Sequence, residues 1–343
     1  MPPPAPDPLE GRIFAAADGS ELDQQALRER MLAADVVYLG EIHDNPHHHA
    51  IQEQLLDGLV AAGASPALAL EAVGSEQTGY LMDYATGAKP GPMAHAGPVS
   101  SRHLRARLDW GDEEDRRWQR YGGLLERARQ ARLPAFGIDL PPAQRLRLQR
   151  VGRSGLAPLE SAQLPPHAEE APAFAGLVRE QLAGAHCGFG TPESIGRLYD
   201  TWVARNDAMA AAVVAALDDP DHRPVLVVVG LAHTAHGQGV LRRVAELRPG
   251  TRQLNLGLYP VAAEPQPLQA YLAAVEVAGS DLGPEHELVW ITPRQERDDP
   301  CAPYRELLRQ RLGEADKQPA EEGQEGERPA EGEQGARPAQ GKE

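Results

Sequence analysis

The sequence contains little cysteine and no long apolar segment. Cys187 and Cys301 are its only cysteines and no Cys-x-x-Cys pair occurs, which argues against a thiolate zinc site and a disulfide framework. A single disulfide between the two stays open. No run of about 18 apolar residues is present, so we expect no segment that spans a bilayer. Met1 to Asp7 has neither the charged start nor the apolar core of a signal peptide. The chain as written is therefore expected in the cytoplasm, unless a leader is missing from it.

Basic residues are too few to balance the acidic ones. The 34 Lys and Arg stand against 50 Asp and Glu, which gives a formal charge of −16. Residues 314–343 hold nine acidic and four basic residues, or −5, and so leave −11 for the rest of the chain. A surface of this sign repels phosphate groups, so we expect neither a nucleic-acid partner nor docking on anionic lipid.

Several motifs of common enzyme classes are missing. The sequence has no His-Glu-x-x-His, which excludes an ordinary zincin protease. Gly-x-Ser-x-Gly and Gly-x-x-x-x-Gly-Lys-Ser/Thr are also absent, which argues against a serine hydrolase with a nucleophile elbow and against a P-loop enzyme. No Cys-x-x-Cys-His occurs, so covalent c-type haem is excluded.

Short apolar segments rich in branched residues recur along the chain, as is typical of strands covered on both faces. The predicted strands are Val36–Leu39, Ala67–Leu70, Ala135–Ile138, Val225–Val229, Gln253–Leu258 and Leu288–Ile291. Apart from the third strand, the interval from about 76 to 222 indicates helices and loops. We therefore predict an α/β fold with a mostly parallel central sheet, flanking helices, and a helical insertion over the carboxyl edge of the sheet.

The two ends of the chain differ in composition from the predicted domain. Residues 1–10 are rich in proline and predict an unstructured lead-in. Residues 314–343 are acidic, with almost no large apolar side chain, and predict a disordered tail. The predicted domain spans residues 11–313.

A cluster of polar residues follows the first predicted strand. The run from Gly40 to His49 holds Glu41, Asp44, Asn45 and four of the chain's histidines, His43 and His47–His49. Asn45 followed by Pro46 is typical of an N-cap and a first helical position. The cluster therefore lies on a strand-to-helix turn, at the sheet edge where ligands usually bind in open α/β folds.

A matching pattern appears after the strand Val225–Val229, where Gly230-x-x-His233 repeats the spacing of Gly40-x-x-His43. Glu71 directly follows the predicted strand Ala67–Leu70. If these strands are neighbours, Glu41, His43, Glu71 and His233 converge. Two carboxylates and two imidazoles suit a divalent metal such as Mn, Fe or Zn that activates water. Without metal, a histidine oriented by a glutamate acts as a general base.

The segments Gly40-Glu41-Ile42-His43-Asp44-Asn45-Pro46-x-His48, Leu70-Glu71, Gly230-x-x-His233 and Asp207-x-Met209-Ala210 resemble the ChaN-like haem-binding family of the Tiki superfamily, over about residues 30–310. The resemblance implies a bacterial protein of the cell envelope that takes part in iron acquisition. It also implies haem held through a tyrosine with help from histidine. The implied haem contacts are His43, His48, His233, Asp207 and Tyr84, with Tyr80 and Tyr199 as other candidates for the tyrosine.

Three functions follow as hypotheses. The favoured one is a haem-binding protein, with haem between the sheet edge and the insertion and a homodimer to cover the flat cofactor. The second is an esterase or peptidase, since the wider superfamily includes metal-dependent proteases and erythromycin esterases; Glu41, His43, Glu71 and His233 would be its catalytic or metal-binding residues. The third is a metal-binding module without turnover, which would use His47–His49.

Overall fold

The computed structural model describes residues 7–87, 99–296, 299, 301–303, 305, 306 and 309. The chain divides into one compact unit, Met1–Arg297, and a second that begins at Asp298. The predicted acidic tail and the first six residues of the predicted lead-in lie outside the described residues. The description below concerns the first unit.

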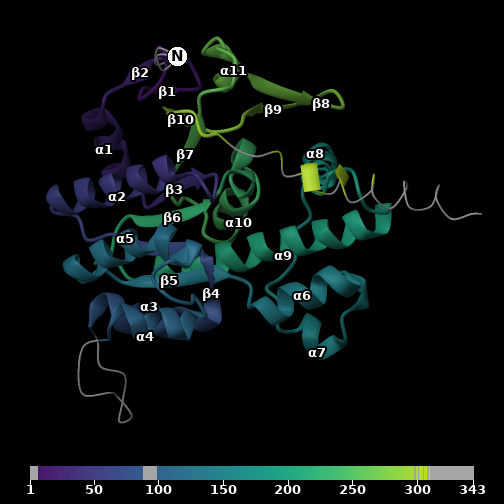
Figure 1. Ribbon diagram of the computed structural model, residues 1–343, viewed down its shortest axis with the longest axis horizontal. Coiled ribbons are helices and arrows are strands. Elements are labelled where there is room, and N and C mark those ends of the chain that lie inside the picture. Colours follow the sequence, from purple (N-terminus) through teal and green to yellow (C-terminus); the bar gives the residue numbers. More distant parts are fainter. Residues whose placement is uncertain are drawn as a thin grey trace, which may run out of the picture. The chain divides into compact units, whose positions relative to one another are not determined.

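A single sheet of eight strands runs through the unit (Figure 1). Its strand order is β2-β1-β10-β7-β3-β6-β4-β5, and the six strands from β10 to β5 are parallel, whereas β1 and β2 form an antiparallel edge. The bounds are β1 Ile13–Ala15, β2 Glu21–Leu22, β3 Val36–Glu41, β4 Ala67–Gly74, β5 Ala135–Asp139, β6 Val225–Gly230, β7 Gln253–Pro260 and β10 Leu288–Thr292. The predicted fold class is confirmed.

All six predicted strands form, and each extends further at its carboxyl end than the apolar pattern indicated. As a result, Glu41 and Glu71 belong to β3 and β4 rather than following them. A buried carboxylate inside a strand breaks the apolar run, so a hydrophobicity pattern ends the strand too early.

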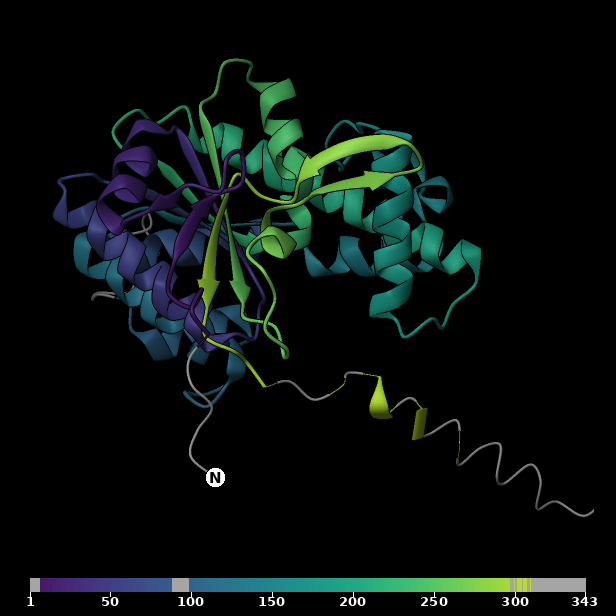
Figure 2. The ribbon, with the colours of Figure 1, turned by 90° about the horizontal axis from the view of Figure 1, so that it is seen from above.

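Helices cover both faces of the sheet (Figures 1 and 2). One face packs against side chains of α1 to α5, and the other packs against α9 and α10. The bounds are α1 Gln24–Ala33, α2 Pro46–Ala61, α3 Thr78–Thr86, α4 Ser101–Leu108, α5 Arg116–Ala131, α6 Pro142–Val151, α7 Pro158–Ser161, α8 Pro172–Ala185, α9 Pro192–Ala216, α10 Val240–Leu247 and α11 Gln269–Leu272. The strands between these layers are buried on both faces, which explains their unbroken apolar runs.

The start of α2 is formed as the sequence predicted. The Asn45 side chain accepts a hydrogen bond from the His47 backbone N–H at 2.9 Å, and Pro46 occupies the first helical turn, where its missing N–H is not needed. This cap fixes the direction in which the chain leaves β3. It thereby holds the polar cluster at the carboxyl edge of the sheet.

The predicted insertion is largely helical, and within its described part β5 is the only strand. Its helices α8 and α9 enclose a separate aromatic core that includes Phe174, Tyr199 and Trp202. Arg145 of α6 and Arg205 of α9 form ion pairs with Asp139 at the carboxyl end of β5.

Four short strands were not predicted. β1 and β2 have two or three residues each, and β8 (Ala274–Val277) and β9 (Ser280–Pro284) form an exposed hairpin. The hairpin turn, Ala278 and Gly279, has positive φ at both residues, as a type I′ turn requires. Residues 8–11, at the end of the predicted lead-in, form a turn. No helix in the described residues is long and apolar enough to cross a membrane, and no described cysteine is free.

Candidate functional site

The carboxyl ends of three adjacent strands bring the four predicted residues together. β6 pairs with β3 on one side and with β4 on the other. His43 Nε2 lies 3.7 Å and His233 Nε2 lies 3.4 Å from Glu71 Oε1. A Cβ on Gly230 would stand only 3.1 Å from His43 Nε2, so glycine allows the imidazole to approach the strand end. The convergence expected from the repeated Gly-x-x-His spacing is present.

Glu41 is buried and engaged at both oxygens. Its Oε1 accepts hydrogen bonds from the Tyr121 hydroxyl at 2.5 Å and from His43 Nδ1 at 2.8 Å, and its Oε2 accepts one from Gln52 Nε2 at 2.6 Å. Burial by itself raises the pKa of Glu41, but the hydrogen bond from His43 and the nearby His49 outweigh it and lower the pKa. Glu41 is therefore an ionised acceptor that orients the His43 ring.

Glu71 is held by a cation and by the backbone. Arg205 Nη2 donates to Glu71 Oε1 at 2.5 Å, and the Gly230 N–H donates to Oε2 at 2.6 Å. Burial raises the pKa of Glu71, but the charges of His233 and Arg205 outweigh that effect and hold the pKa well below its usual range. Arg205 also donates to Asp139 Oδ1 at 2.7 Å, so one guanidinium joins the ends of two neighbouring strands.

His43 carries the positive charge of this site near neutral pH. Burial lowers its pKa, but the hydrogen bond to Glu41 and the charges of Glu71 and Glu41 outweigh burial and raise the pKa to about 9. Its side chain is 49% exposed, so solvent reaches the ring. His43 is consequently a proton donor at neutral pH and accessible from outside.

His233 is oriented by a different set of contacts. Its Nδ1 donates to Asn206 Oδ1 at 2.7 Å, and its ring stacks on Trp202 with centroids 5.7 Å apart and planes 9° from parallel. Nδ1 is committed to the amide oxygen, and Nε2 faces Glu71 Oε1 at 3.4 Å.

The four residues that were predicted to bind a divalent metal, Glu41, His43, Glu71 and His233, are not arranged as a metal site. Within residues 7–87 and 99–296, no group of three or more His, Cys, Asp or Glu side chains is placed to hold a metal ion. Arg205 supplies the cation beside Glu71, and Glu41 is satisfied by three donors. The contacts in this cluster are hydrogen bonds and ion pairs.

His48 is a structural residue. It is fully buried, its Nδ1 accepts from the Ile42 N–H at 3.0 Å, and its Nε2 lies 3.2 Å from Thr292 Oγ1. It thus ties the loop after β3 to the end of β10. Its neighbour His47 is exposed, and His49 points to the His43 carbonyl at 3.0 Å. The three consecutive histidines therefore face different partners and do not share one ligand.

Asp207 and Tyr84 lie in other networks. Asp207 is buried and accepts from Arg243 Nε at 2.8 Å, while Arg153 and His167 approach its second oxygen. Tyr84 is buried, and its hydroxyl donates to Glu126 on α5. The structure gives neither side chain a contact with the Glu41 and Glu71 pairs, so the implied haem contacts at Asp207 and Tyr84 are not part of this site.

Sequence reasoning missed Tyr121, Arg205, Asn206 and Gln52. Tyr121 lies on the buried apolar stripe of α5, and a buried tyrosine hydroxyl needs a partner. Arg205 and Asn206 stand three and four residues after Trp202 on α9; Asn206 is buried and Arg205 is partly buried. Charged and amide side chains on such a stripe were the signal that could have identified them.

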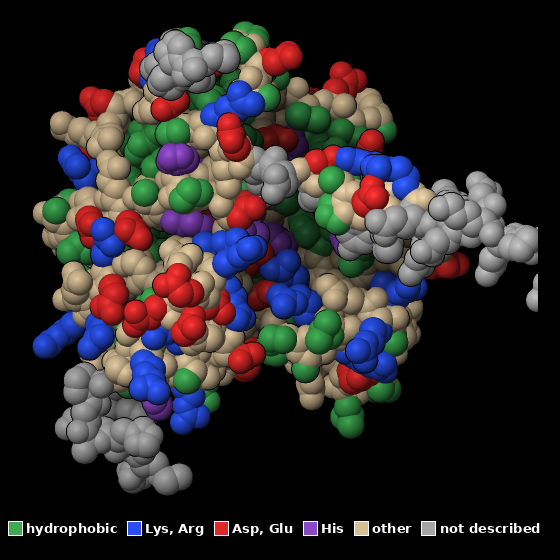
Figure 3. Space-filling model, viewed as in Figure 1, with side chains coloured by type: hydrophobic (Ala, Val, Ile, Leu, Met, Phe, Trp, Pro, Cys, Tyr) green, Lys and Arg blue, Asp and Glu red, His purple; other side chains and the backbone are tan. Residues whose placement is uncertain are grey.

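The surroundings of the site are polar. Figure 3 shows basic, acidic and histidine side chains gathered in a hollow near the centre of the face that is turned to the viewer. A cavity of about 390 Å³ lies next to the site, between the beginnings of α2 and α5, and its lining includes Asp44, His49, Arg116 and Arg120. His49 links this cavity to the site through its hydrogen bond to the His43 carbonyl.

Comparisons with known proteins agree with this fold. The family model described as haem-binding uptake, Tiki superfamily, ChaN matches residues 27–244. ChaN of Campylobacter jejuni, described with cofacial haem binding, has a TM-score of 0.58 at 16% identity, over 83% of this chain and 98% of that chain. A mutant of the erythromycin esterase EreC in its open conformation has a TM-score of 0.47 at 12% identity, over 84% of this chain and 99% of that chain. No curated protein matches.

Proposed function

We propose that this chain, which belongs to the ChaN-like haem-binding uptake family of the Tiki superfamily, binds haem and serves in the acquisition or handling of haem iron. The observation that supports this proposal is the family match, which covers β3 to β6 together with the Glu41, His43, Glu71 and His233 cluster. A role in haem uptake would place the protein in the cell envelope.

The cluster at the carboxyl edge does not fit an axial ligand for haem iron. A histidine ligates iron through a ring nitrogen, and Nδ1 of His43 is already hydrogen-bonded to Glu41 Oε1 at 2.8 Å. Its Nε2 also faces Gly230 and Glu71. The Nε2 of His233 faces the same carboxylate. We therefore do not assign the iron to His43 or His233.

A haemin titration tests the proposed function. Purified protein without haem is titrated with haemin while the visible absorption spectrum is recorded, with His43→Ala and His233→Ala variants alongside. We expect a saturable change of the Soret band in wild type and in both variants. If the Soret change in wild type does not saturate, the protein does not bind haem specifically and the proposal is wrong.

A second function, hydrolysis of an ester or a peptide, is favoured by the geometry of the Glu–His cluster itself. His43 is a protonated, accessible imidazole held by Glu41, and His233 presents Nε2 beside the Glu71 carboxylate. In such a pair, His233 would take a proton from the attacking water and His43 would give one to the leaving group. Each proton transfer typically contributes about 10²–10⁴-fold to the rate.

This second candidate is tested by turnover of haem-free protein on a panel of nitrophenyl esters and short peptides. We expect His43→Ala and His233→Ala each to lower kcat by roughly 10²-fold or more. His47→Ala is the matched control, because this histidine is exposed and lies on the same turn. Equal activity in all three variants would assign any turnover to another site or to a contaminant.

A further inference from the structure

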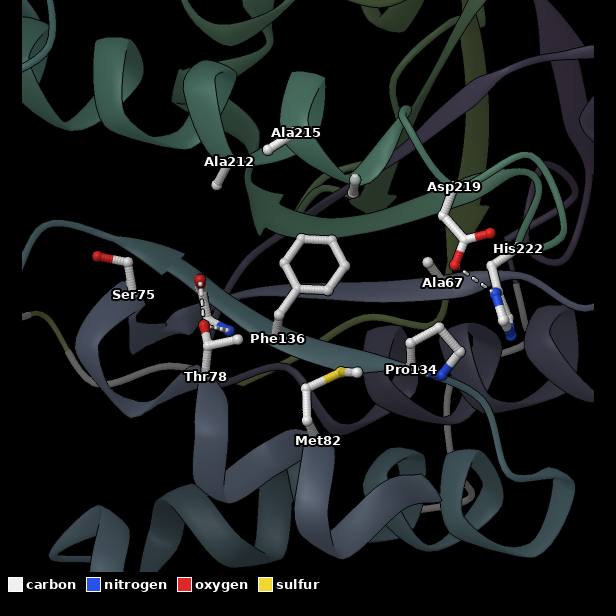
Figure 4. A pocket seen from close by; sticks show the side chains of 12 residues that line it. Ala67, Ser75, Thr78, Met82, Pro134, Phe136, Ala212, Ala215, Asp219 and His222 are labelled. Atoms are coloured by element: carbon white, nitrogen blue, oxygen red, sulfur yellow. Dashed lines mark hydrogen bonds and ion pairs between the residues drawn. The ribbon is translucent and has the colours of Figure 1, made fainter. Parts of the chain in front are cut away.

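A second cavity runs along β5, the edge strand of the sheet. Its volume is about 370 Å³, which falls within the usual range for small-molecule sites of about 300–1,000 Å³. Figure 4 shows the Phe136 ring at its centre, Ala212 and Ala215 of α9 on one side, and Thr78 and Met82 of α3 on the other. The remaining lining residues are Ala67, Ser75, Pro134, Gly137, Ala216, Asp219 and His222.

Most of the accessible lining comes from apolar side chains. Three alanines of α9 form a smooth wall, because a methyl group projects little from the helix. The body of a bound molecule would contact these methyl groups and the Phe136 ring. Its binding would therefore depend mainly on buried apolar area.

The sheet edge in this cavity is closed to a further strand. The Thr78 hydroxyl donates to the Gly137 carbonyl at 3.2 Å and accepts from the Gly137 N–H at 3.2 Å. An added strand would need these backbone groups of β5. Since one side chain satisfies both, the geometry favours a small molecule over a peptide strand.

One end of the cavity carries a negative charge. Figure 4 shows Asp219 and His222 together at this end, and His222 Nδ1 lies 2.9 Å from Asp219 Oδ2. The hydrogen bonds from His222 and from the Asp221 N–H lower the pKa of Asp219, so the carboxyl group is ionised at neutral pH. Among the described residues that line the cavity there is no lysine or arginine.

The end of α9 adds to this negative potential. The carboxyl end of a helix carries a partial negative charge, and α9 has no basic residue in its last turn. The two nearby arginines are engaged outside the lining. Arg248 pairs with Asp218 at 2.7 Å, and Arg223 donates to the backbone carbonyls of Leu217 and Asp219. The charge of Asp219 therefore remains available to a ligand.

His222 offers a second hydrogen-bond acceptor beside Asp219. Donation from Nδ1 to the carboxylate leaves the lone pair on Nε2. Within the described part of the chain, Nε2 of His222 has no hydrogen-bond partner. A carboxylate and an imidazole lone pair at the same end of an apolar cavity both call for a donor, and a positively charged donor satisfies Asp219 best.

We propose that this cavity binds a small organic cation, with an apolar body against Phe136 and the alanines of α9 and an ammonium group that donates to Asp219 and to His222 Nε2. A carboxylate ligand would be repelled by Asp219, and a neutral apolar molecule would gain nothing from either acceptor. Pro134 directly precedes β5 and His222 precedes β6, so this end of the cavity lies at the amino ends of the strands, opposite the Glu–His cluster. The proposal is therefore independent of the proposed function.

The test compares three probes of one shape and different charge on the full chain by isothermal titration calorimetry. They are 4-phenylbutylammonium, the neutral 4-phenylbutanol and the anionic 4-phenylbutyrate. The side chain of Asp219 is 53% exposed, so water screens its charge and the preference should be modest. We expect saturable binding of the ammonium, roughly three- to tenfold tighter than the alcohol, and weaker binding of the carboxylate. Added salt should reduce the preference.

Three variants locate the site. Asp219→Asn should bring the ammonium to the affinity of the alcohol and leave the alcohol unchanged. Asp218→Asn is the matched control, because this neighbouring carboxylate pairs with Arg248 and does not line the cavity. Ala215→Trp fills the cavity and should abolish binding of both probes, and circular dichroism shows whether each variant keeps its fold.

The proposal would be overturned if wild type bound none of the probes, or bound the ammonium and the alcohol equally. It would also be overturned if the preference survived in Asp219→Asn, or if folded Ala215→Trp bound as wild type does. None of these outcomes bears on the haemin titration, so the proposed function stands or falls separately.

Discussion

Replacing Arg205 by methionine tests the electrostatic description of the Glu–His site. The side chain of Arg205 is 20% exposed, and its two carboxylate partners, Glu71 and Asp139, are 4% and 3% exposed. Methionine keeps most of the apolar stem and removes the charge. Both carboxylates then lose a cation inside the protein, which is far more costly than the loss of a surface ion pair.

The size of the destabilisation depends on the hydrogen-bond donors that Glu71 and Asp139 retain in the variant. Glu71 keeps the Gly230 N–H, and Asp139 keeps Arg145 and the Leu140 N–H. Removal of one partner of a buried pair costs about 3–5 kcal/mol, and these remaining donors favour the lower end, about 3 kcal/mol. At about 2–4 °C per kcal/mol for a domain of this size, the melting temperature should fall by about 6–12 °C.

The assay is thermal and urea unfolding of wild type and Arg205→Met from neutral pH to pH 4. Arg205 is one of the charges that hold the pKa of Glu71 low, so the variant's Glu71 takes up a proton at higher pH. The stability difference should therefore shrink as the pH falls. Arg147→Ala is the control, since its ion pair with Glu160 is exposed and should contribute less than about 1 kcal/mol. A loss in Arg205→Met as small as the control's, or one independent of pH, would refute the reasoning.

Three further outcomes are expected. Tyr121→Phe removes the hydroxyl that donates to Glu41 and should lower the free energy of unfolding by about 1.5–3 kcal/mol; no loss in urea unfolding would mean that this hydrogen bond contributes little. His48→Ala leaves the Ile42 N–H and the Thr292 hydroxyl without this partner and should lower the free energy of unfolding by about 1–3 kcal/mol. The affinity for haemin should stay unchanged, and weaker binding of haemin by this variant would argue that His48 is a ligand. The His43 ring should titrate by NMR with a midpoint near pH 9, and Glu41→Gln should move the midpoint toward 6.5. Because folding raises this pKa, the contribution of His43 to stability should be complete below pH 6.5 and be lost as the pH rises through about 9; an unchanged midpoint in Glu41→Gln would exclude Glu41 as the cause.

The pattern of apolar residues was enough to predict the six central strands and the fold class. Those strands are covered on both faces, so their buried side chains follow one another without interruption and the signal is strong. The edge strands β1 and β2 and the exposed hairpin of β8 and β9 gave no such signal. They are held by their neighbours in the sheet or by a two-residue turn that lacks the usual Asn-Gly.

Part of the candidate site was also readable from local sequence. Glu41 is the last residue of β3, His43 and His233 follow β3 and β6, and parallel strands end at the same edge of a sheet. The local sequence did not predict the different roles of neighbouring histidines. His43 and His48 are five residues apart, yet one is accessible and the other fully buried, because the turn and the first turn of α2 direct them to opposite sides.

The sequence by itself determined the sheet, the cap of α2 and the strand ends at which carboxylates and imidazoles gather, since these depend on residues close together in the chain. Only the tertiary structure decided which of these side chains contact one another and which of them are ionised. Arg205 lies 134 residues from Glu71 and Tyr121 lies 80 residues from Glu41, and those contacts set the ionisation of the site. The cavity of about 370 Å³ along β5, drawn in Figure 4, likewise depends on α3, α9 and the loop at His222, which packing alone brings together.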